Sequence, residues 1–199
     1  ALLGWNPGTE QEIFTLQELC DQFSLERVNK SGARFNPDKA KWFNHKYLVQ
    51  KSDAELAVQL NEFLVKDGIS YDMAKLEKIC RLLKERANFV ADIYNSSFYH
   101  APQAYDEKGV KKSWKEETPV LMQELIEVLE KVADFTSPNT EEAVKEWVSG
   151  KEIGFGKIMN PFRLAIIGSA DGPHMFDIIE ILGKEESLTR LHRIISTLK

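Results

Sequence analysis

Apolar residues recur at helical spacing along most of the chain, whereas the alternation typical of strands is rare. Ser52-Asp53-Ala54-Glu55 has the pattern of a capping box and predicts a helix that ends at Asp67-Gly68. A second apolar stripe keeps one face for about six turns and predicts a single helix from Asp72 to Asn95. We therefore expect a mostly α fold with about seven to nine helices.

Prolines and glycines divide the second half of the chain. Residues 98–112 contain a proline, a glycine and several lysines, and they indicate a linker with a domain boundary nearby. After this linker we expect four helices, and a glycine ends three of them. They start at Thr118-Pro119, at Asn139-Thr140 (ending at Gly150), at Asn160-Pro161 (ending at Gly168) and at Gly172-Pro173 (ending at Gly183). An amphipathic helix is expected to finish the chain.

Composition excludes several classes of protein. The chain has 199 residues, 43% of them hydrophobic, and a net charge of -5. Its apolar runs are shorter than the roughly 18–20 residues that a membrane span needs, and its start lacks the basic residues of a secretory signal. We therefore expect a cytoplasmic protein that does not contact a membrane. The apolar start at Ala1, without an initiator methionine, predicts a piece of a longer protein.

Motifs for chemistry are missing from the sequence. It contains no Walker A loop, no HExxH zinc motif, no GxSxG elbow and no dinucleotide-binding glycine pattern. The two cysteines form no CxxC pair, and the four histidines are scattered. We therefore expect no catalytic residue, no metal site and no cofactor within these residues.

Basic and aromatic residues alternate in one segment. Residues 26–51 hold seven basic side chains against two acidic ones, although the whole chain is acidic. A helix that begins at Pro37-Asp38 would place Lys39, Trp42 and Lys46 close to one face, where they could meet a sugar-phosphate backbone. An alternative is that Trp42 and Phe43 belong to the core and that the lysines are merely solvated.

Several of these motifs, in their order along the chain, resemble bacterial glutamyl-tRNA synthetases. The matches cover both ends of the chain and, more loosely, its middle. They are Leu2-Leu3-Gly4-Trp5, Glu12-Ile13-Phe14, Phe23-Ser24-Leu25-Glu26-Arg27-Val28, the run from Ala33 to Tyr47, the run from Asn160 to Gly168, Gly172-Pro173, and Ile181-Leu182-Gly183-Lys184-Glu185.

This resemblance implies a fold and a function. It implies a stem-contact segment at residues 1–51, a helical connecting subdomain at 52–108 and an anticodon-binding subdomain at 109–199, the last two forming an all-α helical cage. The family's full-length enzyme activates glutamate with ATP and Mg²⁺ and attaches it to tRNA-Glu. Its HIGH and KMSKS signatures are absent from this sequence. The resemblance therefore implies that this chain is the part of the enzyme that holds tRNA, and that glutamate and ATP bind to another part.

The resemblance also assigns roles to residues. Lys39, Trp42 and Lys46 match the contact with the inner elbow and stem of the tRNA. The residues that match the anticodon contacts are Arg86, Arg163, Gly172, Pro173 and Met175. The sequence departs from the family pattern at Gly172 and at His174, which leaves side-chain contacts at these two positions open.

Other interpretations remain open at this stage. Arg86 and Arg163 could form structural ion pairs with acids such as Glu85 or Asp171. The whole chain could be a helical scaffold that binds another protein through an apolar groove. It could also be the tRNA-binding part of a class I lysyl-tRNA synthetase, which shares the helical architecture.

Overall fold

The computed structural model describes residues 2–95 and 97–198 of the chain. Over these residues it contains eleven α-helices, three short 3-10 helices and no strand, apart from one isolated bridge between Trp5 and Val28. The mostly α fold predicted from the sequence is therefore confirmed. The number of helices exceeds the prediction for three reasons: a short helix lies at residues 16–22, where none was expected, another lies in the expected linker, and the helix expected from Asp72 to Asn95 is divided.

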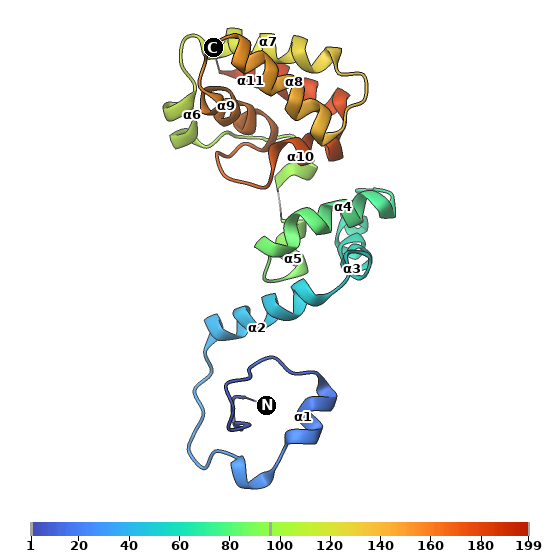
Figure 1. Cartoon of the computed structure of the whole chain (residues 1–199), viewed down its shortest axis with the longest axis vertical. Helices are drawn as coiled ribbons and strands as arrows, with labels where there is room; N and C mark the ends of the chain where they lie inside the picture. Colours follow the sequence, from blue (N-terminus) through green and yellow to red (C-terminus); the bar gives the residue numbers. More distant parts are fainter. Residues whose placement is uncertain (1, 96, 199) are drawn as a thin grey trace.

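The amino-terminal segment forms an open loop at one end of the molecule (Figure 1). It contains α1 (Leu16–Gln22) and η1 (Leu25–Arg27), and neither helix buries a residue. The chain then enters α2 (Pro37–Gln50), where the Asn36 side chain accepts hydrogen bonds from the first-turn amides and a proline stands at the first position. The predicted start of this helix is confirmed.

The next two helices pack against each other. α3 (Asp53–Lys66) begins with the predicted capping box, in which Ser52 and Glu55 exchange hydrogen bonds. α4 (Met73–Leu83) follows after a short turn and buries one apolar stripe. The predicted end of α3 at Asp67-Gly68 is also confirmed, with Gly68 at φ +72°.

The single helix predicted from Asp72 to Asn95 is wrong. α4 ends at Leu83, η2 (Lys84–Arg86) follows, and a new helix, α5 (Val90–Tyr94), begins after a break. The Asp92 carboxylate accepts hydrogen bonds from the backbone amides of Asn88 and Phe89. Such a side-chain acceptor competes with helical hydrogen bonding, which explains the break although the apolar stripe continues through it.

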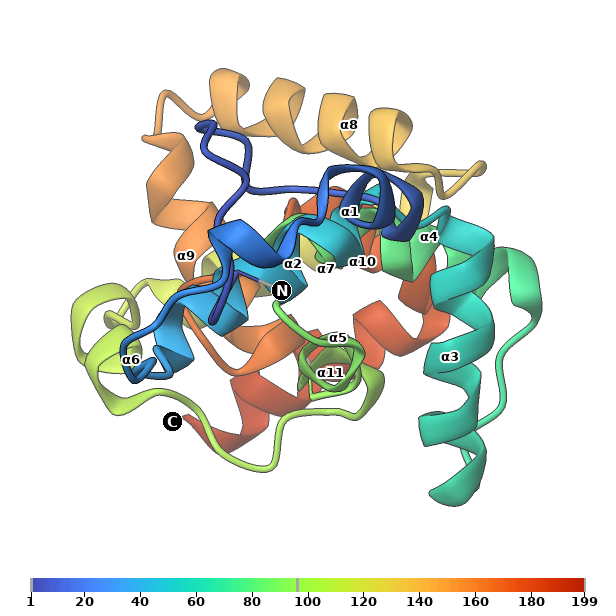
Figure 2. The same ribbon diagram turned by 90° about the horizontal axis from the view of Figure 1, so that it is seen from below.

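The remaining helices form a bundle at the other end of the molecule (Figure 1). Their bounds are η3 (Ser97–Tyr99), α6 (Glu107–Ser113), α7 (Thr118–Lys131), α8 (Ser137–Gly150), α9 (Phe155–Ile167), α10 (Met175–Leu182) and α11 (Lys184–Thr197). A view along the long axis shows α3 and α6 on opposite sides of the molecule (Figure 2).

Three expectations about this bundle were wrong in detail. The expected linker at 98–112 contains most of α6, which packs on α9 where Gly109 allows a close approach to Leu164. α8 begins at Ser137, before the expected cap at Asn139-Thr140. α9 begins at Phe155, so Pro161 lies inside the helix, where it is buried and removes one backbone donor.

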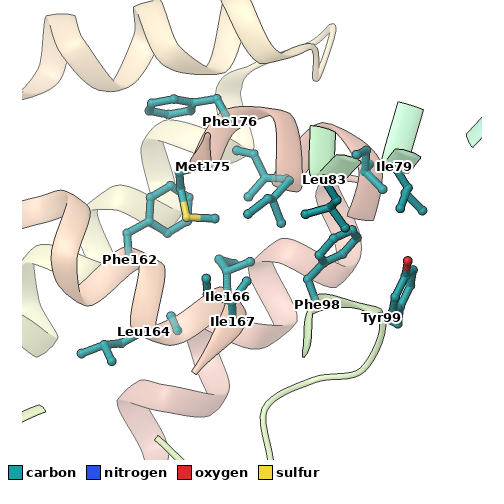
Figure 3. Close-up of a cluster of buried hydrophobic side chains, with 14 of the residues drawn as sticks. Ile79, Leu83, Phe98, Tyr99, Phe162, Leu164, Ile166, Ile167, Met175 and Phe176 are labelled. Carbon is teal, nitrogen blue, oxygen red and sulfur yellow. The ribbon is translucent and has the colours of Figure 1, made fainter. Parts of the chain in front are cut away.

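Buried apolar side chains form one continuous cluster that runs from Leu48 to Ile194. Figure 3 shows the part where Ile79 and Leu83 of α4 meet Phe98 and the helices α9 and α10. The end of α4 is therefore anchored in the core shared with the bundle. The division at residues 51 and 108 stays a prediction.

One charged side chain lies inside this core. Arg190 is 1% exposed, and its guanidinium donates to Glu186 Oε1 and to the carbonyl oxygen of Ile166, each at 2.7 Å. The bond to Ile166 ties α11 to the end of α9, and the bond to Glu186 lies within α11. Among the described residues, no helix is long and apolar enough to cross a membrane.

Candidate nucleic-acid interface

The break between α4 and α5 presents Arg86 at the surface. Arg86 is the last residue of η2, and its side chain is exposed. Within residues 2–95 and 97–198 it forms no ion pair, so the alternative of a structural pair with Glu85 finds no support. Its guanidinium is therefore available to a ligand.

Arg163 lies on α9 and fastens the loop that follows this helix. Its Nη1 donates to the carbonyl oxygen of Pro173 at 2.6 Å, and the side chain is half-buried. Burial lowers the pKa of Arg163, the nearby positive charge of Arg86 lowers it further, and Asp171 opposes both effects. The charge of Arg86, in the turn after α4, thus acts on Arg163 of α9, so the two arginines lie near each other.

The loop between α9 and α10 is tightly packed. A Cβ at Gly172 would lie 2.7 Å from Ile167 Cδ1 and 3.1 Å from Arg163 Nη1, so a larger residue would disturb both. Pro173 and Met175, both expected to contact RNA, have buried side chains. If these two residues contact a ligand, the contact must come from their backbone.

His174, which precedes α10, is exposed between two carboxylates. Its Nδ1 lies 3.3 Å from Asp177 Oδ2, and its Nε2 lies 3.6 Å from Glu141 Oε2. Asp177 in turn accepts a hydrogen bond from Ser137. His174 is thus flanked by one carboxylate from α8 and one from α10.

The face of α2 carries a cation over an aromatic ring. Lys46 Nζ lies 5.7 Å from the centre of the Trp42 ring, which is 37% exposed. The alternative that Trp42 belongs to the core is therefore wrong. Lys39 does not contact the Trp42 ring. It forms an ion pair with Glu12, and its Nζ lies 5.7 Å from the centre of the Phe43 ring. The structure thus brings Trp42 and Lys46 together and places Lys39 at the next ring.

Two residues of α2 that the sequence did not single out connect this helix to the Arg86 turn. His45 Nδ1 lies 2.8 Å from the carbonyl oxygen of Ala87, and the Asn44 amide donates to the carbonyl oxygen of Asn88. Both bonds join residues more than 40 positions apart in the sequence. No local signal in the sequence indicates such contacts.

The opposite side of α2 holds the amino-terminal segment. The Tyr47 hydroxyl donates to the carbonyl oxygen of Phe14 at 2.9 Å. A hollow of about 570 Å³ lies between this segment and α2, and its charged lining includes Arg34, Lys39 and Glu12. In the part of the chain that is described, no group of three His, Cys, Asp or Glu side chains could hold a metal ion.

The whole chain is similar in sequence and in fold to glutamate–tRNA ligases. Two glutamate–tRNA ligases, from Flavobacterium johnsoniae and Flavobacterium psychrophilum, are 52% and 51% identical to the chain over 200 residues. The crystal structure of a glutamate tRNA ligase from Elizabethkingia meningosepticum superimposes with a TM-score of 0.94 at 42% identity. Each match covers 100% of this chain but only 40% of the relative, so the chain spans less than half the length of these ligases.

The family model described as "Anticodon binding domain" matches residues 55–195, more than two thirds of the chain. The matched range contains α4, the Arg86 turn, α9 and the α9–α10 loop. It leaves out α2 and the amino-terminal segment. We conclude that the chain belongs to the anticodon-binding domain family and is similar, over its whole length, to the carboxyl-terminal part of glutamate–tRNA ligases.

Proposed function

We propose that the chain is the tRNA-binding part of a glutamate–tRNA ligase and that it holds the anticodon loop and the inner elbow of tRNA-Glu. The observation that carries this proposal is that Arg86 and Arg163 lie near each other and that neither forms an ion pair among the described residues. The family match and the names of the similar ligases support it.

Guanidinium groups suit the reading of unstacked bases. An arginine can donate two hydrogen bonds to the O2 and N3 acceptors of a cytosine, whereas guanine presents a donor edge there. One such bidentate pair is worth about 1–3 kcal/mol of discrimination. We assign this role to Arg86, because its side chain is exposed and unpaired among the described residues. It would separate a glutamate anticodon ending in C from a glutamine anticodon ending in G.

Arg163 has a second task in this proposal. Its bond to Pro173 holds the α9–α10 loop, while its other N–H donors make no hydrogen bond to the described residues. Gly172 lets the loop approach Arg163 closely, and the backbone of Pro173 and Met175 replaces the buried side chains as the contact surface. No side chain of the described residues caps the start of α10, so its first amides can donate to a base or a phosphate.

The α2 face would contact the stem and elbow. Trp42 and Lys46 offer a ring and an ammonium group together, which suits a sugar-phosphate backbone. Lys39 would join them by exchanging its ion pair with Glu12 for a phosphate. These contacts supply affinity, and the anticodon contacts supply selectivity.

In the proposed parent enzyme, glutamate, ATP and Mg²⁺ bind in the part of the ligases that lies outside this match. The chain's own contribution is to orient tRNA so that its 3′ end reaches that part. The cytoplasmic location expected from the sequence belongs to the same proposal. We also keep the three-part division at residues 51 and 108 as a proposal, with the family match beginning at residue 55.

Binding to tRNA tests this function. We expect the 199-residue chain to bind tRNA-Glu more tightly than tRNA-Gln, and the logarithm of its affinity to fall linearly with the logarithm of the salt concentration, with a slope of about −3 for about four phosphate contacts. Equal affinity for both tRNAs, or binding that does not respond to salt, would contradict the proposal. If the chain still retains protein partners from a lysate after nuclease treatment, the result would instead favour a protein-binding scaffold. If the intact parent enzyme attaches lysine to tRNA, the result would favour a lysyl-tRNA synthetase.

A further inference from the structure

We propose that Asn44 and His45 are positioning residues that hold the Arg86 turn against α2, so that Arg86 and the Trp42–Lys46 face contact one RNA at the same time. This inference rests on the proposed function and extends it to two residues that carry no RNA contact of their own. Its basis is a pair of hydrogen bonds between α2 and the break that follows α4.

The two bonds reach the backbone directly after Arg86. The carbonyl oxygen of Ala87 can only accept, so the Nδ1 of His45, 2.8 Å away, must carry the proton. The Asn44 amide donates in the same way to the next carbonyl oxygen, that of Asn88. The His45 bond is partly buried, where a hydrogen bond competes less with water.

Two backbone amide groups of this turn are bound by Asp92. Asp92 Oδ2 accepts from the amides of Asn88 and Phe89 at 2.8 and 2.9 Å. The side chain of Ala87 is 3% exposed and belongs to the buried cluster. The backbone after Arg86 is thus fixed through its carbonyls by α2, through its amides by Asp92 and through one methyl group by the core, while the Arg86 side chain stays exposed.

This arrangement matters for binding because it is rigid before RNA arrives. A break between two helices would otherwise lose conformational freedom on binding, and that loss would weaken the complex. Asn44 and His45 lie between Trp42 and Lys46 on one helix, which rises about 1.5 Å per residue. The contacts to Ala87 and Asn88 therefore set the distance between the α2 face and Arg86.

The test compares five single variants, one of which is Arg86→Gln, and one double variant of the 199-residue chain. His45→Leu and Asn44→Ala each remove one donor. His45→Asn is the conservative variant, because its amide nitrogen is attached at the same carbon position as Nδ1. His192→Leu is the matched control, because His192 is exposed on α11, far along the chain from the turn. His45→Leu is also combined with Arg86→Gln.

The first measurement is the ratio of affinities for tRNA-Glu transcripts with C or G as the third anticodon base. We expect this ratio to fall about tenfold in His45→Leu and in Asn44→Ala, to stay within about twofold of the unaltered chain in His45→Asn, and not to fall further when His45→Leu is added to Arg86→Gln. Affinity for the G transcript should change little, because the phosphate contacts remain. A merely structural role would lower both affinities together.

The second measurement is hydrogen exchange of the backbone amides of residues 87–89, without RNA. We expect about tenfold faster exchange in His45→Leu and Asn44→Ala, with unchanged exchange in α9 as evidence that the fold is intact. Should His45→Leu fail to fold, Asn44→Ala decides both measurements. Unchanged exchange at residues 87–89 would overturn the inference.

The two proposals fail in different ways. If the unaltered chain has no preference for the C transcript, the proposed function falls, and this inference falls with it. If the unaltered chain prefers the C transcript and both donor-removing variants keep that preference, the inference alone is overturned. Loss of preference in the His192→Leu control would also overturn it, because the effect would then not depend on the α2 contacts.

Discussion

The guanidinium of Arg163 is bonded to the carbonyl oxygen of Pro173 at 2.6 Å and also lies near enough to Arg86 for the two charges to oppose each other. A repulsion between like charges is tolerated here because the bond to Pro173 holds one of them in place. An approaching anion or an acceptor edge of a base would relieve the repulsion. Asp171 offsets part of this repulsion, and we expect an acceptor-rich ligand to offset more of it.

Replacement of Arg163 by alanine should affect both the fold and tRNA binding. The Pro173 carbonyl would lose a charge-assisted hydrogen bond in a partly buried place, so we expect the free energy of unfolding to fall by about 1–2 kcal/mol. Affinity for tRNA-Glu should fall about tenfold. Urea denaturation and filter binding measure the two effects. Arg163→Lys, which keeps the charge, should recover part of the affinity, and full affinity in Arg163→Ala would contradict the assignment.

Arg86→Gln should change selectivity without changing stability. The Arg86 side chain is exposed, so we expect the free energy of unfolding to stay within about 0.5 kcal/mol of the unaltered value. The preference for a C-ending over a G-ending anticodon should fall about tenfold. Competition binding with the two transcripts measures this. Arg193→Gln, at an exposed position of α11, serves as the control, and a retained preference in Arg86→Gln would remove its proposed role.

Gly172→Ala should displace the Arg163 guanidinium. The new methyl group would overlap Ile167 Cδ1, so the Ile167 side chain must shift, and it would press on Arg163 Nη1, so the guanidinium must also move slightly. We expect a destabilisation of about 0.5–1.5 kcal/mol and weaker tRNA binding. Gly156→Ala in α9 is the matched control, because its Cβ would meet open space, and it should be neutral or slightly stabilising. Equal melting temperatures of the two variants would contradict this prediction.

Local sequence signals predicted helix starts well where the cap is made by neighbouring side chains. Ser52 and Glu55 satisfy each other's backbone amides within four residues, so their pattern is visible without tertiary structure. Asn36 before Pro37 is a similar case. The start of α9 was missed because Pro161 is normally a sign of a first turn, whereas here the buried surroundings keep it inside the helix.

The site was predictable only in part. The resemblance to a family indicated Arg86 and Arg163, but the apolar stripe through α4 concealed the break that exposes Arg86. The contacts of Asn44 and His45 with the turn join distant parts of the chain and have no periodic signature. The burial of Met175 likewise depends on how α10 packs, which spacing along one helix does not reveal.

Trp42→Ala should lower the affinity for tRNA by more than it lowers the free energy of unfolding. The ring is 37% exposed and meets Phe43 edge-on at 5.0 Å, so we expect a loss of stability of only about 1 kcal/mol. Affinity for tRNA should fall about tenfold, since ring contacts with nucleic acid are worth about 1–3 kcal/mol each. Trp42→Phe should keep most of the affinity. Binding by Trp42→Ala that equals that of the unaltered chain at low salt would contradict a role in RNA contact.

Asp53 should make the fold sensitive to acid. The ammonium group of Lys84 beside the carboxylate holds the pKa of Asp53 below its ordinary value of 3.8, against the opposing effect of burial and with further help from Arg81. Its two partners are Lys84 Nζ at 2.8 Å and Arg81 Nε at 2.9 Å, which join the start of α3 to the end of α4 beside the Arg86 turn.

A carboxyl group whose pKa is lower in the folded than in the unfolded chain adds stability above its unfolded pKa, and this stability is lost as the pH falls through the folded value. Asp53→Asn should therefore lower the free energy of unfolding by about 1 kcal/mol at pH 7 and make its decline below about pH 4 less steep. Urea denaturation at pH 7, 5, 4 and 3 measures this. Glu62→Gln, at an exposed position of the same helix, should keep the steep decline, and an equally steep decline in Asp53→Asn would show that the ion pairs with Lys84 and Arg81 do not contribute.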